Sequence, residues 1–402
     1  MNILVIAQRI PYPANKGEKI RSFNQAKFLA DLGHQIDVFA PIEDNAEIAY
    51  ANQLNQLTNF SCNYSTLSTK PLRLLFGLLK NESLSVANFY CQALQQQIDN
   101  ALHNRQYDAI LCTSSAVAKY IFNSKAFTNL NTKPLLLMDY MDLDSDKWQQ
   151  YADKTTWPMK LIYQREAKLI SEYEQKIQQY FDACFFIADA EVALFKANSP
   201  TPNINNVYTL GNGLNTEEFY PADSAPNNAA PKFIFTGVMD YKPNVDAVVW
   251  FVENCWQLIL QQYPNAEFII AGMNPNAAVM HLKKYHGITI TGFVDEILPY
   301  YHQADYFVAP FRLARGVQNK VLQAFACGLP VISTPMGAEG IDCVDGEHIL
   351  LANTPEDFLQ QVQQLEKEAS LKQTIKDNAL ALIHNHYSWH GKLAPLKALL
   401  EE

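Results

Sequence analysis

Positively charged side chains gather between two short apolar runs in the C-terminal half of the chain. The first run ends at Pro310 and the second begins at Val331. Between them stand six residues that can contact phosphate or sugar oxygens: Arg312, Arg315, Gly316, Asn319, Lys320 and Gln323. A diphosphate that leaves a sugar gains negative charge, which fixed cations and the free amides of a helix N-terminus stabilise. We therefore predict a diphosphate-sugar pocket here, with Lys320 and Arg315 as catalytic cations.

The spacing within this stretch predicts how its groups reach a ligand. A helix that begins near Val317 places Lys320 and Gln323 on one face, so that both can contact the same molecule. An arginine binds two oxygens through its planar fork, whereas a lysine supplies a compact charge. Two other interpretations remain open: the cations solvate an ordinary helix entrance, or the site has decayed.

The same stretch resembles a known donor-binding signature. The run QAFACGLPV at 323–331 is similar to that of the retaining glycosyltransferases of family four, which have the GT-B fold. In that family a Glu at the position of Gln323 binds the nucleotide ribose, and many members carry another Glu where this chain has Arg315. An amide still accepts a hydrogen bond from a ribose hydroxyl but lacks the charge, so we expect weaker donor binding.

The resemblance implies further donor contacts in the same half. Gly237 and Lys242 resemble the glycine strand end and the nearby basic residue that approach the diphosphate. Phe293 and Val294 resemble the turn whose backbone reads the nucleotide base. The implied donor is a nucleotide-diphosphate sugar of the UDP or GDP type, and the resemblance implies no separate cofactor.

A second loop with possible chemistry runs from Gln8 to Arg21. Gly17 stands just before a helix and lets a ligand approach the backbone, while Arg9, Lys19 and Arg21 can meet phosphate or an anionic acceptor. In the family this loop faces the donor. We therefore assign Gly17 to the donor site and the three cations to the acceptor side. A solvated strand-to-helix loop is the alternative.

Acidic residues mark a third loop, at the end of the apolar run 134–139. Asp139 and Asp142 can orient acceptor hydroxyls or accept a proton, so both are assigned to the acceptor side and Asp142 also to catalysis. The following helix can equally take its N-cap from this loop, at Asp144, Ser145 or Asp146. Together the three loops resemble a narrower group, the sugar transferases of PEP-CTERM/exosortase exopolysaccharide systems. That resemblance implies a glycan or a lipid-linked acceptor.

Strands that alternate with helices must position these loops. The strands expected in the first half are 2–7, 35–40, 108–112, 134–139 and 182–187, and those in the second half are 232–236, 266–271, 305–309 and 330–333. A long helix is expected at 143–180, kinked or divided at Pro158. We predict an α/β protein with two doubly wound, Rossmann-like domains that bind ligands at the carboxyl ends of their strands.

The domain boundaries follow a shift in composition. Residues 199–231 are rich in Asn, Pro, Thr and Ala, and are expected to connect an acceptor-side domain at 1–198 to a nucleotide-sugar-binding domain at 232–385. By resemblance to GT-B enzymes, the two domains face each other across a cleft. Residues 386–402 are expected to form a helix that crosses back to the first domain.

Composition excludes several classes of protein. The net charge of −10, from 31 basic and 41 acidic residues, argues against nucleic-acid binding through a broad basic surface. The 7 cysteines form no CxxC pair, so we expect a reduced, cytoplasmic protein. His386 and His390 are four residues apart, but no acid or cysteine accompanies them at ligand spacing, so we expect no metal site. The sequence has no apolar run of the roughly twenty residues that a transmembrane helix needs.

Residues 70–80, which read KPLRLLFGLLK, can form an amphipathic helix. Apolar side chains stand at 72, 75, 76 and 79, which is one helical stripe. Such a stripe suits a peripheral contact with the inner face of a membrane, beside a lipid-linked acceptor. A helix packed on the core shows the same pattern.

Three classes of function remain from the sequence. A retaining, metal-independent glycosyltransferase of the hexosyltransferase type explains all three loops. A nucleotide-sugar epimerase of similar fold explains the donor half but leaves the resemblance to the narrower transferase group unexplained. A noncatalytic GT-B scaffold with a degenerate site is the third class. Donor turnover without acceptor would favour the epimerase, and tight partner binding without nucleotide affinity would favour the scaffold.

Overall fold

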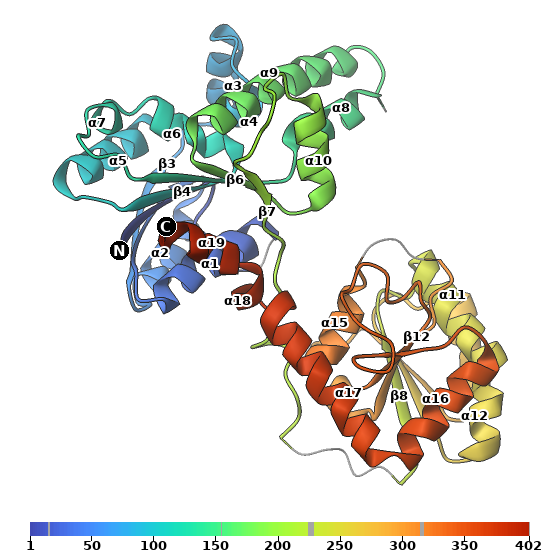
Figure 1. The fold of residues 1–402 in the computed structure, drawn as a ribbon. Coiled ribbons are helices and arrows are strands. Elements are labelled where there is room, and N and C mark those ends of the chain that lie inside the picture. The colour runs from blue at the N-terminus through green and yellow to red at the C-terminus, as the bar shows by residue number, and fades with distance from the viewer. Residues whose placement is uncertain (15–16, 154, 224–228, 314–316, 402) are drawn as a thin grey trace. The chain divides into compact units, whose positions relative to one another are not determined.

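The chain folds into two units, each a parallel sheet covered by helices (Figure 1). The structure is a computed structural model that describes residues 1–402 except 15–16, 154, 224–228, 314–316 and 402. The first unit comprises Met1–Asn212 and Lys392–Glu402, and the second comprises Gly213–Gly391.

The first unit has a seven-stranded parallel sheet in the order β3-β2-β1-β4-β5-β6-β7. Its strands are β1 (Asn2–Ala7), β2 (Gln35–Ile42), β3 (Phe60–Thr66), β4 (Ala109–Thr113), β5 (Leu135–Met141), β6 (Ala183–Phe186) and β7 (Val207–Thr209). Its helices are α1 (Gly17–Asp31), α2 (Ile48–Leu54), α3 (Lys70–Leu79), α4 (Leu84–Asn88), α5 (Gln92–Asn104), α6 (Ala118–Phe122), α7 (Lys125–Thr128), α8 (Asp144–Asp153), α9 (Met159–Tyr180), α10 (Asp189–Asn198) and α19 (Ala394–Glu401).

The second unit has a six-stranded parallel sheet in the order β10-β9-β8-β11-β12-β13. Its strands are β8 (Lys232–Thr236), β9 (Glu267–Ala271), β10 (Ile288–Gly292), β11 (Tyr306–Ala309), β12 (Val331–Ser333) and β13 (Leu350–Leu351). Its helices are α11 (Lys242–Trp250), α12 (Gln257–Gln262), α13 (Ala277–His281), α14 (Leu298–Gln303), α15 (Asn319–Ala326), α16 (Pro355–Lys367) and α17 (Ala369–Leu382), and α18 (Trp389–Lys392) spans the boundary between units.

The central strands are apolar along their whole length because helices cover both faces of each sheet. Residues 3–7 of β1 are fully buried, as are the aromatic residues Phe233 and Phe235 of β8. In each sheet the strand order reverses beside the first strand, between β1 and β4 and between β8 and β11. Doubly wound sheets bind ligands at the carboxyl ends of the strands on either side of such a reversal.

The predicted α/β class and the two Rossmann-like sheets are confirmed. The expected connector at 199–231 is only partly a connector, because its residues 207–209 pair with β6 as an edge strand of the first sheet. The expected helix at 143–180 is divided into α8 and α9, and Pro158 immediately precedes α9. Strands β3 and β10 were not predicted, because both are half exposed and polar residues interrupt their apolar pattern.

The last residues, Lys392–Glu402, pack with the first unit, whereas residues 386–391 of the expected C-terminal helix belong to the second unit. Leu393 and Leu396 are fully buried, and both belong by their contacts to the unit that holds the N-terminus. A search of the described residues for a helix long and apolar enough to cross a membrane finds none.

Candidate functional site

The carboxyl ends of β8 and β11 bring Gly237 close to α15, which carries three other predicted donor residues. Gly237 directly follows β8, and the loop after β11 leads to α15, which carries Asn319, Lys320 and Gln323. Two distant segments, α11 and α15, meet at this point through a bond from Lys320 to Asn244. The reversal of strand order in the sheet therefore places these groups at the position where such a fold binds its ligand.

Lys320 is a partly buried cation at this strand edge. Its Nζ donates a hydrogen bond to Asn244 Oδ1 at 2.5 Å and lies 4.7 Å from the ring centre of Phe235 and 5.1 Å from that of Phe311. No carboxylate of the described residues forms an ion pair with it. Burial lowers the pKa of Lys320 to about 7. A lysine in such surroundings gains from an anionic ligand that restores its charged form.

Glycine is required beside this lysine. A Cβ atom on Gly237 would lie 2.6 Å from Asn244 Nδ2 and 2.9 Å from Lys320 Nζ, and the residue has a φ of +156°. A Cβ atom on Gly272, after β9, would lie 1.7 Å from the carbonyl oxygen of Gly237. The two strand ends therefore pack closely against each other and against Asn244 and Lys320, and only glycine permits this close packing.

Gln323 is held by a chain of hydroxyl groups. The Tyr301 hydroxyl donates to Gln323 Oε1 at 3.2 Å and also lies 2.7 Å from Thr236 Oγ1. Tyr301 is fully buried, and burial raises the pKa of its phenol far above its ordinary value. The hydrogen bond from Tyr301 therefore fixes the orientation of the Gln323 amide. The two N–H groups of its Nε2 can donate to other partners.

The other predicted donor residues have different surroundings. Arg312 forms a bidentate ion pair with Asp246, with bonds of 2.6 and 3.1 Å, and stacks over Trp250. It must therefore leave or share Asp246 to bind a phosphate. Lys242 is exposed at the first residue of α11. Phe293, which is 68% exposed, follows β10 with Val294 beside it. Arg315 and Gly316 lie outside the described residues.

In the first unit, Arg21 and Asp139 form a buried ion pair. Arg21 Nε and Nη2 donate to the two carboxylate oxygens at 2.6 and 2.8 Å, and Gln25 donates to the same carboxylate at 2.6 Å. Arg21 Nη1 also donates to Asn212 Oδ1 at 2.9 Å. Both side chains are almost wholly buried. This pair joins α1 to β5, and its geometry favours a positioning role over the direct acceptor contact that the sequence suggested.

The remaining residues of the N-terminal loop are only partly engaged. Arg9 stacks over Phe89, with 5.9 Å between the guanidinium carbon and the ring centre, and the largely buried Lys19 lies 5.3 Å from the ring centre of Tyr50. Gly17 begins α1, and no atom lies within 4 Å of a Cβ built on it. The structure thus leaves space beside Gly17 but does not itself require glycine there.

Asp142 is exposed at the carboxyl end of β5, beside a hollow of about 410 Å³ that Asp146 and Glu191 also line. The suggested N-caps at 144–146 already lie within α8. Carboxylates from other helices take their place, because Glu191 accepts from the Leu143 amide at 3.0 Å and Glu174 accepts from the Ser145 amide at 3.1 Å. Asp142 remains available at the strand end.

Burial changes the titration of two acids near this loop. It raises the pKa of Asp144 to about 6 and that of Glu174 to about 8. Glu174 is almost fully buried in α9, directly beneath the start of α8. A protonated Glu174 accepts this bond more weakly than a carboxylate does, so the anchoring of this loop depends on pH.

Sequence reasoning missed three residues of the second-unit site: Asn244, Tyr301 and Thr236. Asn244 directly follows Lys242 and Pro243. Its position at the start of the helix after β8 could have identified it as a site residue. The tyrosine comes from α14, whose short amphipathic pattern gave no indication that it would reach α15.

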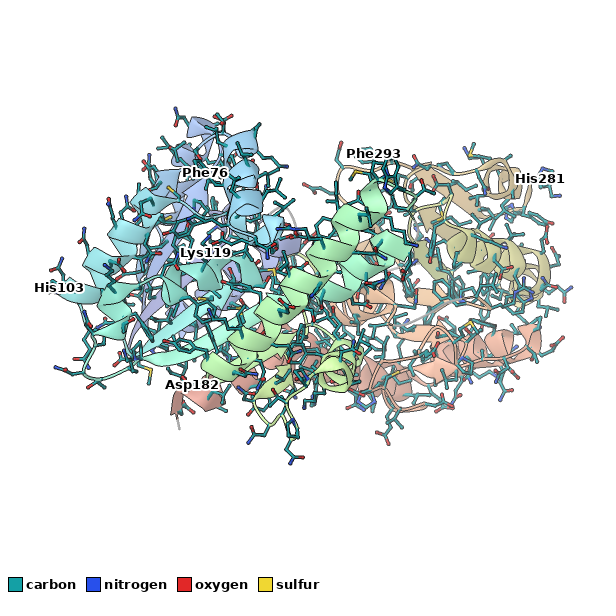
Figure 2. The ribbon with its side chains drawn as sticks, turned by 90° about the horizontal axis from the view of Figure 1, so that it is seen from above. Phe76, His103, Lys119, Asp182, His281 and Phe293 are labelled. Carbon is teal, nitrogen blue, oxygen red and sulfur yellow. The ribbon has the colours of Figure 1, made fainter. Side chains whose placement is uncertain are left out.

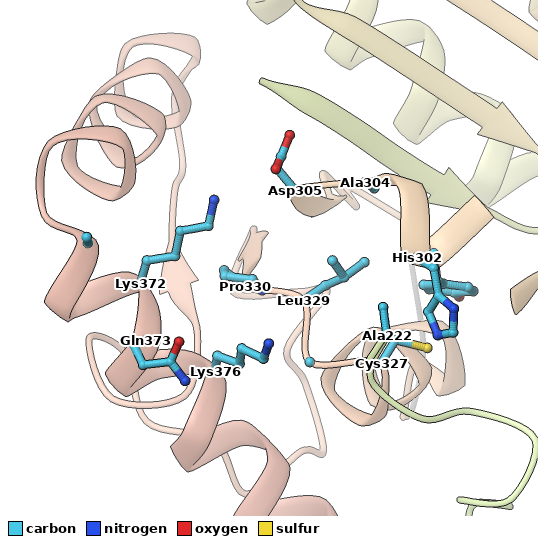
Figure 3. A pocket seen from close by; sticks show the side chains of 13 residues that line it. Ala222, His302, Ala304, Asp305, Cys327, Leu329, Pro330, Lys372, Gln373 and Lys376 are labelled. Atoms are coloured by element: carbon cyan, nitrogen blue, oxygen red, sulfur yellow. The ribbon is translucent and has the colours of Figure 1, made fainter. Parts of the chain in front are cut away.

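Another hollow of the second unit lies at the opposite end of its sheet. It has a volume of about 310 Å³ and includes Asp305 and Pro330, which immediately precede β11 and β12. Figure 3 shows Lys372 and Lys376 reaching toward it from α17. Because it is at the amino ends of the strands, it is separate from the Lys320 site. Among the described residues, no group of three or more His, Cys, Asp and Glu side chains is arranged to hold a metal ion.

Comparison with protein families and known sequences finds proteins that are similar to this chain. Residues 230–368 match the family described as glycosyl transferases group 1. An uncharacterized 44.6 kDa protein in the cps region of Klebsiella pneumoniae is 23% identical over 394 residues, which is 96% of each chain. An uncharacterized glycosyltransferase of Methanocaldococcus jannaschii is 27% identical over 110 residues, which is 27% of this chain and 31% of that protein.

Solved structures show the same fold at low sequence identity. HepE from Anabaena, solved in complex with UDP, aligns over 100% of both chains with a TM-score of 0.58 and 13% identity. A glycosyltransferase from Rickettsia africae aligns over 100% of this chain and 97% of its own, with a TM-score of 0.56 and 16% identity. Residues 230–368 are therefore similar to the group 1 glycosyl transferases, and the whole chain has the GT-B-like fold of these structures.

Proposed function

We propose that the protein transfers a hexose from a nucleotide-diphosphate sugar to a glycan or a lipid-linked acceptor. The observation that carries the proposal is Lys320, a partly buried cation with no ion-pair partner among the described residues, at the carboxyl edge of the sheet that matches the glycosyltransferase family. Gly237 lets the end of β8 lie close to this lysine, because any side chain there would clash with Lys320 and Asn244. A diphosphate bound there would stabilise the protonated, charged form of Lys320. It would also accept hydrogen bonds from backbone amides at the strand ends.

The proposed reaction retains the configuration of the sugar and needs no metal ion. The bond between the anomeric carbon and the donor phosphate breaks, and Lys320 stabilises the charge that develops on the leaving diphosphate. The acceptor hydroxyl attacks from the same face, and its proton passes to a phosphate oxygen of the leaving group. Arg315 would add a second cation to the leaving group.

Two relatives support the choice of donor and pathway. The Anabaena protein HepE has been solved with UDP and with UDP-glucose, so a UDP-sugar is the first donor to test, with a GDP-sugar as the second. The Klebsiella pneumoniae relative is described as a protein of the cps region, which favours a role in polysaccharide synthesis. We propose that this role is exopolysaccharide synthesis of the PEP-CTERM type, at the inner face of the cytoplasmic membrane.

The first test is calorimetric titration of the protein with UDP and with GDP. We expect one nucleotide to bind, and Lys320→Ala to weaken it by roughly tenfold to a hundredfold, since hydrogen bonds to charged groups are worth about 1.5–3 kcal/mol. Lys284→Ala is the matched control, because Lys284 lies in the same unit but bonds to His281 away from the strand ends. Failure of both nucleotides to bind would support the noncatalytic scaffold instead.

The second test follows the sugar itself. Incubation with the matching nucleotide sugar, with and without a mixture of cell-derived glycolipids, should give a glycosylated product only when an acceptor is present. The anomeric configuration of that product, measured by NMR coupling constants, should equal that of the donor. An epimerised donor in the absence of acceptor would identify the protein as an epimerase and refute the proposed transfer.

A further inference from the structure

Helix α3 turns its apolar side away from the protein. Leu72, Leu75, Phe76 and Leu79 are all exposed, and Leu79 is 74% exposed. The buried members of the helix are Arg73 and Gly77. A helix that packs on a core buries its apolar stripe, so this arrangement excludes the core interpretation of residues 70–80.

Contacts made by the opposite face of α3, which carries Arg73 and Gly77, fix the helix in this orientation. A Cβ atom on Gly77 would lie 2.6 Å from the Cβ of Ala87, so α3 and α4 approach closely there. Arg73 Nη2 donates to Asn88 Oδ1 at 3.1 Å and to Glu43 Oε1 at 3.3 Å. These contacts would be lost if the helix rotated to bury its leucines.

A second exposed apolar segment lies where α9 begins. Trp157 is 77% exposed, and Met159, Leu161 and Ile162 are exposed beside it. Trp157 and Leu161 were not singled out by the sequence pattern as surface residues. An isolated exposed side chain is ordinary, but a run of large ones indicates an interaction surface.

The two segments adjoin on the first unit. Arg165 Nη2 on α9 donates to Asn81 Oδ1 and to the Glu82 carbonyl oxygen, both at 3.2 Å, just after the end of α3. Leu161 precedes Arg165 by one helical turn and so lies on the same side of α9. Figure 1 shows α3, α4 and α9 together at one end of the unit, and Figure 2 marks Phe76 there from above. We name these apolar residues, with Lys70, Lys80 and Lys160, the α3–α9 surface.

The charge of this surface is opposite to that of the whole chain. Neither 70–80 nor 155–165 contains an Asp or a Glu, and Lys70, Lys80 and Lys160 are exposed among the apolar side chains. The chain as a whole carries a net charge of −10. An apolar surface edged by lysines and containing an exposed tryptophan matches the interface of a bilayer with anionic headgroups.

We propose that the α3–α9 surface docks the protein on an anionic lipid bilayer, with α3 lying in the plane of the headgroups. The apolar side chains enter the boundary of the acyl chains, and the three lysines contact lipid phosphates. The docking does not depend on the proposed sugar transfer, because none of these residues belongs to the Lys320 site. It would bring a soluble donor and a lipid-linked acceptor to one surface.

The test is sedimentation of the full chain with vesicles of phosphatidylethanolamine and phosphatidylglycerol. We expect binding to these vesicles, weaker binding at high salt, and little binding to vesicles of phosphatidylcholine alone. The double variant Phe76→Gln with Leu79→Gln should lose roughly tenfold or more in partitioning, since each buried CH₂ contributes about 0.8 kcal/mol. Trp157→Gln should weaken partitioning by a smaller factor, and Lys70→Glu with Lys80→Glu should remove the salt dependence.

Matched controls separate docking from general stickiness and from the proposed activity. Leu57→Gln removes another exposed leucine of the first unit, 37% exposed, and should leave partitioning unchanged. Lys320→Ala should also partition as the wild type even where it no longer binds nucleotide. The proposal is overturned if the wild type ignores anionic vesicles or if the double variant partitions equally. Concentration-dependent dimers that the double variant abolishes, with no vesicle binding, would assign the surface to a second copy instead.

Discussion

The two sheets use a cation at the carboxyl ends of their strands in opposite ways. In the second unit, Lys320 has an amide partner and no ion pair among the described residues, and burial lowers its pKa to about 7. In the first unit, Arg21 is buried against Asp139 in a bidentate pair. The uncompensated cation is suited to an incoming anion, whereas the paired one connects a helix to a strand. A basic residue beside a strand end is therefore a ligand candidate only when its counter-charge is missing.

The largest expected effect is on the paired cation. Asp139→Asn removes the charge that compensates Arg21, and breaking a buried pair in this way costs about 3–5 kcal/mol of unfolding free energy. Urea unfolding measures the loss. The matched control is Asp31→Asn, which breaks the exposed pair of Lys27 and Asp31 and should cost less than about 1 kcal/mol. An equal loss in both variants would refute the positioning role.

The next effect concerns the glycine beside the free cation. Gly237→Ala places a Cβ atom within 3 Å of Asn244 and Lys320, so it should cost roughly 1–3 kcal/mol of stability and weaken nucleotide binding. Gly17→Ala is a control for stability alone, because nothing lies within 4 Å of its Cβ and alanine favours the helix by about 0.5–1 kcal/mol. Thermal unfolding and calorimetry together measure both consequences. Unchanged nucleotide affinity in Gly237→Ala would count against a ligand at this strand end.

A third prediction is a pH dependence that belongs to Lys320. Its pKa in the folded state, about 7, lies below the ordinary value of 10.5, so the unfolded chain binds more protons between these values. The contribution of Lys320 to the unfolding free energy therefore rises with pH across this window, by at most about 1.4 kcal/mol per unit. Lys320→Met should lack this rise. Nucleotide affinity should move the other way and fall as pH passes above about 7, because the lysine loses its charge.

The smallest expected effect is on the ribose side of the site. Gln323→Glu restores a charged acceptor where the amide now stands, and charge-assisted hydrogen bonds are about twice as strong as neutral ones. We expect nucleotide affinity to increase several-fold by calorimetry. Gln373→Glu, at the other end of the same sheet, adds the same charge without the contact and should leave affinity unchanged. A decrease in Gln323→Glu would mean that the donor orients its ribose elsewhere.

The sequence predicted the fold because the strands are buried on both faces and read as unbroken apolar runs. β1, β4 and β8 are of this kind. β3 and β10 were missed because half-exposed strands carry polar residues that hide them in the pattern. The apolar stripe at 72–79 was recognised, but its direction was not, since the tertiary contacts of Gly77 with Ala87 and of Arg73 with Asn88 decide which side faces the protein.

The sequence predicted those residues of the candidate site that lie on one helix. Lys320 and Gln323 are three residues apart on one helix, so their shared face follows from the sequence. Asn244 and Tyr301 come from other helices and reach the site only through tertiary packing. The pairing of Arg21 with Asp139 joins residues far apart in the chain, and local spacing carries no sign of it.

The C-terminal helix has a consequence for how the protein is made. Leu393, Leu396 and Leu400 are buried in the unit that begins at Met1. The first unit leaves the ribosome first, but it cannot complete its packing until the whole second unit and then α19 have been synthesised. Until then, the apolar surface that α19 covers stays exposed. We therefore expect chaperones to bind the nascent first unit during translation. The second unit is one continuous segment, 213–391, and can fold as soon as it has been synthesised.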